Sequence, residues 1–211
     1  MMSIANLCTR QPIPNFTAYF GDRGIRTLLT VMWDAYKDLC SEGTVGTVMN
    51  EDEITEEWFC KVYIHFKHLD LPVVPVYQKA DSTKAKNRGK KPTIDFCFRS
   101  EWDCNSYFGA ECKIVDGGKP SLYAKYINKG VNRYLEGIYG SKSASGAMVG
   151  YIRKGDVNMV VSEIKTRLHV LPGNPSLFRD KNYKDDHYTS THKRDLGVSP
   201  FNLHHLFFVF C

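Results

Sequence analysis

Apolar residues recur at helical spacing near the start of the chain and at strand spacing in its middle. Over residues 22–40 they lie three and four positions apart, and a second helix is predicted from Asn50, where acidic residues suit a first turn. Three apolar, β-prone runs follow, at Val73–Tyr77, Thr93–Phe98 and Tyr107–Val115. Because Pro72 and Pro75 lack backbone donors, we expect the first run to lie at an edge or strand start.

Helix and strand patterns alternate in the second half. A helix is predicted from Ser121 to about Tyr139, a short buried strand over Ala147–Arg153, and a helix over Val157–Leu171. Residues 172–200 show little apolar periodicity and are predicted to be rich in loops, before a last hydrophobic strand at Leu206–Phe210. This order predicts one α/β domain with a mixed sheet flanked by helices.

Two acids interrupt the apolar runs in the middle of the chain. Asp95 lies in one run, and Glu111 and Lys113 lie in the next. Since side chains alternate along a strand, Glu111 and Lys113 point the same way and Cys112 points away from them. If the runs are neighbouring strands, the three ionisable groups converge, which is costly without a partner. Magnesium or manganese suits such hard oxygen ligands. The alternative is a Glu111–Lys113 salt bridge on an exposed face.

The segment Lys91-Pro92-Thr93-Ile94-Asp95, followed by Glu111-Cys112-Lys113, resembles the PD-(D/E)XK nuclease signature. Here two residues separate the proline from the aspartate. The resemblance implies a restriction-endonuclease-like core with the element order αβββαβ. It places that core at residues 50–155, with an N-terminal helical extension at 1–49 and a C-terminal helix, loop and strand at 156–211.

The same resemblance assigns roles to the residues of the motif. Asp95, Glu111 and Lys113 are the expected catalytic residues. Asp95 and Glu111 bind the metal, the backbone carbonyl of Cys112 completes its shell, and Lys113 positions and activates the attacking water. The implied cofactor is Mg²⁺, for which Mn²⁺ substitutes.

Some members of this family take another acid from the helix before the strands. Glu53 is our choice here, with Asp52 and Glu56 as rivals. The alternative explanation is that these acids only favour the first turn of a helix.

Basic residues gather on both sides of the acids. The connection at 79–91 contains Lys84, Lys86, Arg88, Lys90 and Lys91, and the following helix carries Lys125, Lys129 and Arg133 at intervals of four. A flexible basic loop favours phosphate backbones without reading bases. We expect both groups to contact nucleic acid, and the alternative is that they are solvated surface.

The histidines indicate no zinc site. Neither His65 and His68 nor His204 and His205 have cysteines at zinc-ligand spacing. The polar segment His187–Arg194 is predicted to be a surface loop, with DNA contact or support of the site as the alternative.

Composition adds limits rather than a function. Lys and Arg number 28 against 23 Asp and Glu, a balance that nucleic acid tolerates but does not require. The seven cysteines are odd in number and show no C-x-x-C spacing, as expected of reduced thiols in a cytoplasm. The sequence shows neither a run of about 18 apolar residues nor a signal-peptide pattern. We therefore expect a cytoplasmic protein with no membrane partner.

These observations predict a metal-dependent endonuclease that hydrolyses phosphodiester bonds of DNA. DNA is preferred over RNA because the family mostly cuts DNA, and restriction or antiphage defence is the setting suggested by analogy. One active site cuts one strand at a time, so a homodimer or a place in a larger complex is expected. A metal-dependent RNase and a non-catalytic nucleic-acid-binding module on the same fold are the alternatives.

Overall fold

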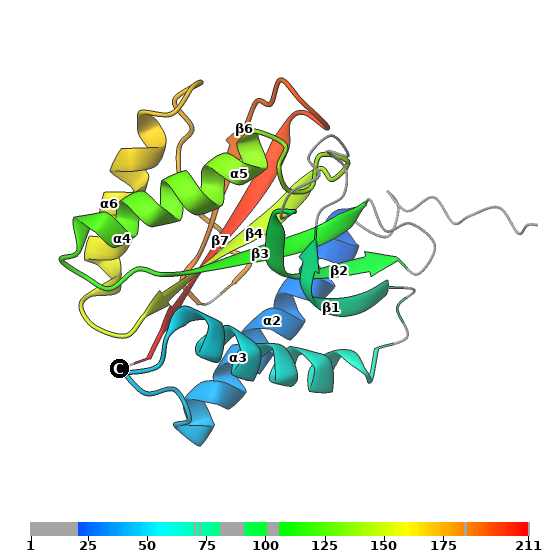
Figure 1. Ribbon diagram of the computed structural model, residues 1–211, viewed down its shortest axis with the longest axis vertical. Helices are drawn as coiled ribbons and strands as arrows, with labels where there is room; N and C mark the ends of the chain where they lie inside the picture. Colours follow the sequence, from blue (N-terminus) through cyan, green and yellow to red (C-terminus); the bar gives the residue numbers. More distant parts are fainter. Residues whose placement is uncertain are drawn as a thin grey trace, which may run out of the picture.

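A mixed β-sheet forms the centre of the molecule (Figure 1). The computed structural model describes residues 21–69, 71, 73–80, 91–100, 106–183 and 185–210. Within these ranges the sheet has seven strands in the order β1-β2-β3-β4-β7-β6-β5. The strands are β1 (Val73–Ala80), β2 (Thr93–Ser100), β3 (Tyr107–Ile114), β4 (Ser145–Ile152), β5 (Phe178–Arg179), β6 (His187–His192) and β7 (Phe201–Val209).

The strand directions make the sheet mixed. The first three strands are antiparallel neighbours, and β3, β4 and β7 run parallel. β6 and β5 are again antiparallel to their neighbours. The α/β class with a mixed sheet is confirmed, and among the described strands β1 is at an edge of the sheet, a position that tolerates its proline.

Helices cover both faces of the sheet (Figure 1). The helices α2 (Asp22–Glu42) and α3 (Glu51–Phe66) pack on one face, whose apolar layer includes the Cys112 side chain. The other face carries α4 (Pro120–Tyr126), the π-helical turn η2 (Ile127–Val131), α5 (Asn132–Leu135) and α6 (Val157–His169). Because Glu111 and Lys113 alternate with Cys112 along β3, they belong to this second face.

The start of α3 is fixed by a capping box. The side chain of Asn50 accepts hydrogen bonds from the amides of Asp52 and Glu53, and the Glu53 carboxylate accepts one from the amide of Asn50. These bonds satisfy donors that a helix start leaves unpaired. The predicted start of this helix at Asn50 is confirmed.

The loop prediction for residues 172–200 was partly wrong. Within this segment β6 pairs with β7 along its whole length, and His187, Ser190 and His192 are buried. The polar segment His187–Arg194 is therefore not a surface loop. Its buried side chains are polar and form hydrogen bonds inside the protein, as Ser190 and His192 do with each other. The strand therefore shows no alternation of apolar and polar residues by which the sequence could predict it. The last strand also begins earlier than predicted, at Phe201.

Two further features bear on the sequence expectations. The cysteines among the described residues, Cys40, Cys60, Cys97 and Cys112, form no disulfide. In that part of the chain, no helix is long and apolar enough to cross a bilayer.

Candidate active site

Asp95 and Glu111 meet where β2 and β3 stop pairing. The register joins Phe96 to Ala110, so Asp95 stands opposite Glu111 one residue further on. There the Asp95 carboxylate accepts a hydrogen bond from the amide of Cys112 at 2.6 Å. The Asp95 side chain thus replaces the backbone acceptor that the next strand-to-strand hydrogen bond would use, and this bond holds the two acids on adjacent strands.

The Lys113 ammonium lies among three carboxylates. Its Nζ atom is 2.8 Å from Glu111, 3.1 Å from Glu51 and 3.9 Å from Asp95. The side chains of Lys113 and Glu111 are only 6% and 2% exposed. An exposed surface salt bridge is therefore the wrong description of the E-x-K triplet. The sequence expectation that Asp95, Glu111 and Lys113 converge is met by this geometry.

The acid that the helix contributes is Glu51, not Glu53. Glu51 accepts hydrogen bonds from Lys113 and from the amide of Ile114, both at 3.1 Å. Glu53 instead closes the capping box and is exposed. A sequence signal for Glu51 exists, because it precedes the buried Ile54 and Thr55 by three and four residues and so shares their helix face.

The electrostatics of the cluster are set by burial and by mutual charge. Burial, then the charge of Asp95, raises the pKa of Glu111 to about 7. Burial also raises the pKa of Asp95. For Lys113, burial favours the neutral amine, but the surrounding carboxylates outweigh it and raise its pKa, so the ammonium stays charged.

Glu51 has the opposite balance. Burial alone favours its neutral form, but Lys113, the Ile114 amide and Lys125 together outweigh it and lower its pKa. Glu51 is therefore ionised at neutral pH, whereas Glu111, with its pKa raised to about 7, is only partly ionised there. Two acids in different protonation environments are typical of sites that handle protons or bind cations.

The π-helical turn η2 packs against Met148, the residue of β4 that is paired with Glu111. Gly130 of η2 packs on the tip of Met148, and a Cβ atom at this position would overlap the Met148 side chain and lie 3.9 Å from Cγ of Glu111. π-helical turns within α-helices are frequent at functional sites. Gly130 thus lets the helix after the E-x-K triplet pack closely on Met148 beside the acid.

The predicted basic residues fall into three groups. Arg133 lies 3.6 Å from Glu111 and donates a hydrogen bond to Tyr139, while Lys125 pairs with Glu51 at 3.1 Å. Lys129 and Lys91 are exposed. Lys84, Lys86, Arg88 and Lys90 lie outside the described residues.

The residues present suit a hard divalent cation by their chemistry. Three carboxylates face one buried ammonium, and Oε2 of Glu111 is buried with no hydrogen-bond partner in the described part of the chain. The carbonyl of Cys112 accepts a hydrogen bond from Lys113. Within the ranges described, no three or more His, Cys, Asp or Glu side chains form a ready cage for an ion. A cation bound at these carboxylates would compete with the Lys113 ammonium for the same oxygens.

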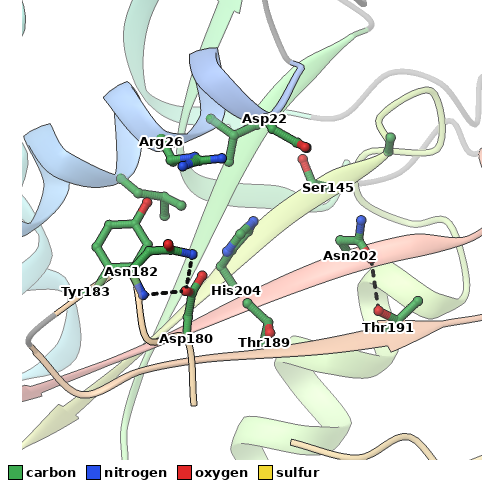
Figure 2. A pocket seen from close by; sticks show the side chains of 13 residues that line it. Asp22, Arg26, Ser145, Asp180, Asn182, Tyr183, Thr189, Thr191, Asn202 and His204 are labelled. Atoms are coloured by element: carbon green, nitrogen blue, oxygen red, sulfur yellow. Dashed lines mark hydrogen bonds between the residues drawn. The ribbon is translucent and has the colours of Figure 1, made fainter. Parts of the chain in front are cut away.

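A cavity of about 350 Å³ lies on the opposite face of the sheet (Figure 2). Asp22 and Arg26 of α2 line one side, and Asp180 lies on the other. His204 of β7 lies among them, with the remaining walls mostly polar. None of these residues was singled out as a site from the sequence, because they come from segments far apart in the chain.

Hydrogen bonds fix which atom of His204 carries its proton. The indole of Trp33 can only donate, so Nδ1 of His187 accepts its bond at 3.1 Å. The remaining proton of His187 is then on Nε2, which donates to Nδ1 of His204 at 3.1 Å. Neutral His204 therefore carries its proton on Nε2. Burial, mainly, lowers the pKa of His187 to about 3 and that of His204 to about 4.

Comparisons with models of protein families, with curated proteins and with solved structures found no match to this chain.

Proposed function

We propose that the protein is a metal-dependent endonuclease that hydrolyses phosphodiester bonds of DNA. The observation that carries the proposal is the buried convergence of Asp95, Glu111 and Lys113 on two paired strands, joined by Glu51 from the preceding helix. A purely structural ion cluster needs no unpartnered buried oxygen, whereas Oε2 of Glu111 is one among the described residues.

The arrangement of elements also supports a restriction-endonuclease-like core. Along the chain α3, β1, β2, β3, the helix beginning with α4, and β4 follow one another in the order αβββαβ. β4 returns parallel to β3, so the helix crosses over the face that carries Glu111. The proposed site therefore lies between the sheet and this crossover.

Asp95, Glu111 and Glu51 are the residues that would hold Mg²⁺ or Mn²⁺. When bound, such an ion stabilises charge on the phosphate and supplies a nucleophile at neutral pH. Lys113, whose pKa is raised by its carboxylate neighbours, keeps its proton. It therefore acts as a donor that orients water and offsets negative charge, not as a base.

Cleavage of plasmid, linear and single-stranded DNA, beside RNA, with Mg²⁺, Mn²⁺ or EDTA tests the proposal. Metal-dependent cutting of DNA is expected. It should fall by a factor on the order of 100 or more in Glu111→Gln and in Asp95→Asn, which remove ligand charge at constant shape. Glu53→Gln is the matched control, because Gln at that position also completes a capping box and leaves cleavage unchanged.

The outcomes separate the alternatives. Cutting of RNA alone assigns the protein to metal-dependent ribonucleases. Salt-dependent nucleic-acid binding by folded protein without cutting assigns it to non-catalytic binding modules. Because one site cuts one strand, a homodimer or a partner subunit is part of the proposal. Cleavage of both strands by a protein that is monomeric in solution contradicts that part.

A restriction or antiphage-defence role is proposed by analogy with the family alone.

A further inference from the structure

A second cavity, of about 450 Å³, adjoins the acid cluster on the far side of Glu51. It lies between the start of α3, the end of β3, the start of α4 and the end of β4. Its basic wall residues are Lys119, Lys125 and Arg153, and its acidic ones are Glu51 and Asp52. Glu51 bonds to Lys113 on one side and to Lys125 on the other, so this carboxylate separates the cluster from the cavity.

Arg153 is held in place by a fully buried acid. Asp116 accepts hydrogen bonds from the amide and the guanidinium of Arg153, the closest at 2.7 Å from Nη2, and Nη1 donates to the carbonyl of Met49. These bonds use one hydrogen on each terminal nitrogen, and each nitrogen carries two. The guanidinium therefore keeps two donors in a fixed orientation, while its side chain remains 15% exposed.

Lys119 lies at the same anchor. Its Nζ atom is 3.7 Å from the Asp116 carboxylate, and its side chain is 55% exposed. The wall next to Asp116 thus presents a fixed guanidinium and an exposed ammonium, whereas the wall acids Glu51 and Asp52 belong to the start of α3. A planar guanidinium with spare donors beside an ammonium is a favourable arrangement for a phosphate group.

We propose that this cavity binds a backbone phosphate of the nucleic-acid strand adjacent to the phosphate that is cut, through Arg153 and Lys119. The inference rests on the proposed nuclease function and deepens it, because it gives the strand a second fixed point beside the acid cluster. Phosphate contacts of this kind set the register of the strand without reading its bases. Positioning by a second contact is worth large factors in rate when the reacting groups must align.

Oligonucleotides that each carry one neutral methylphosphonate linkage test the subsite directly. With wild-type protein, we expect cleavage to be slowed at least about 10-fold by a neutral linkage at one position adjacent to the cut. In Lys119→Gln, the normal substrate should be cut more slowly, and this linkage should cause little further loss. Lys67→Gln, at an exposed lysine just after the far end of α3, is the matched control and should keep the wild-type profile.

Binding measured on cleavage-deficient Glu111→Gln protein gives a second readout. Adding Lys119→Gln should reduce the slope of log affinity against log salt by about 0.9 for duplex DNA or about 0.7 for a single strand, the loss of one phosphate contact. Arg153→Lys keeps the charge but loses the two-pronged donor set, so it should weaken binding and keep most of the salt slope.

The results separate the subsite from the nuclease function. If wild-type protein cuts but Lys119→Gln keeps the same methylphosphonate profile, the subsite is overturned and the nuclease stands. If wild-type protein cuts nothing, the proposed function fails. The slope of log affinity against log salt then tests phosphate binding by the cavity without reference to cleavage. An unchanged slope in Lys119→Gln rejects the cavity as a phosphate site.

Discussion

At the scale of single residues, Lys113 holds the candidate site together. Among the described residues, it is the only cationic side chain that lies within 4 Å of all three carboxylates, those of Asp95, Glu111 and Glu51. Buried ions are tolerated when each finds a partner, and removing one partner leaves the others uncompensated. The same three carboxylates are the oxygens proposed to hold the metal, so stability and metal binding are coupled through Lys113.

Replacing Lys113 by Met should therefore destabilise the protein by about 3–5 kcal/mol at pH 8. The loss should shrink at pH 5, because Glu111, whose pKa is raised to about 7, is then neutral. Mg²⁺ should raise the melting temperature of this variant more than that of the wild type, since the ion no longer competes with an ammonium. Thermal denaturation of both proteins with and without Mg²⁺ measures this. An equal Mg²⁺ effect in the two contradicts a metal site at these acids.

At the scale of elements, the sequence predicts much of the scaffold but not which side chains finish the site. Helical apolar spacing locates α2 and α3, and apolar, β-prone runs locate β1, β2 and β3, because β2 and β3 are buried along most of their length. β6 escapes because its buried side chains are polar: Ser190 bonds to both His192 and His205. Such a strand becomes recognisable only once its partner side chains are known.

The helix acid was missed for a geometric reason. Glu51 and Glu53 are two residues apart, about 200° around a helix, so only one of them can face the sheet. The capping box uses Glu53, and the buried face of α3 carries Glu51. The spacing of Glu51 from Ile54 and Thr55 shows in the sequence that Glu51 shares their buried face. However, acids are common in the first turn of any helix because they interact favourably with the helix dipole.

The π-helical turn supports a prediction at the same scale. Gly130→Ala should displace the Met148 side chain and destabilise the protein by about 1–3 kcal/mol, a cost that outweighs the roughly 1 kcal/mol that Ala gains in helix propensity. Adding Met148→Ala should make the Gly130→Ala change less costly, as a double-mutant cycle of denaturant unfolding would measure. Gly46→Ala, where a Cβ meets only one atom at 4.0 Å, is the control. Additive effects of the two core changes contradict the contact.

At the scale of the whole molecule, the sheet separates two networks of hydrogen-bonded polar side chains, one on each of its faces. One hydrogen-bonded chain joins Trp33, His187 and His204 on the α2 face, and another joins Tyr126, His205, Ser190 and His192 on the opposite face. The strands β6 and β7 carry both chains, since alternate residues point to opposite faces. The far end of the sheet is thus built from neutral histidines, while the acid cluster occupies the strands at its other end.

These histidines should make the fold sensitive to acid. Burial, mainly, lowers the pKa of His187 to about 3 and those of His192 and His204 to about 4. An unfolded histidine has a pKa of about 6.5, so the unfolded chain binds more protons between these values, and stability falls as the pH drops from about 6.5 to about 4. Glu111 acts in the opposite direction, because its raised pKa favours the folded state as it becomes protonated.

Four histidines have lowered pKa values (His187, His192, His204 and His205) and two acids have raised ones (Glu111 and Asp95), so we expect the melting temperature to fall between pH 6.5 and pH 4.5. His192→Gln should flatten this dependence, because it removes one group that the unfolded chain protonates first. His68→Gln, at an exposed position, should leave the dependence unchanged. Melting curves of the three proteins across this range decide the matter. A wild-type profile in His192→Gln means that this histidine is not held neutral by the fold, and the pH dependence then has to come from other groups.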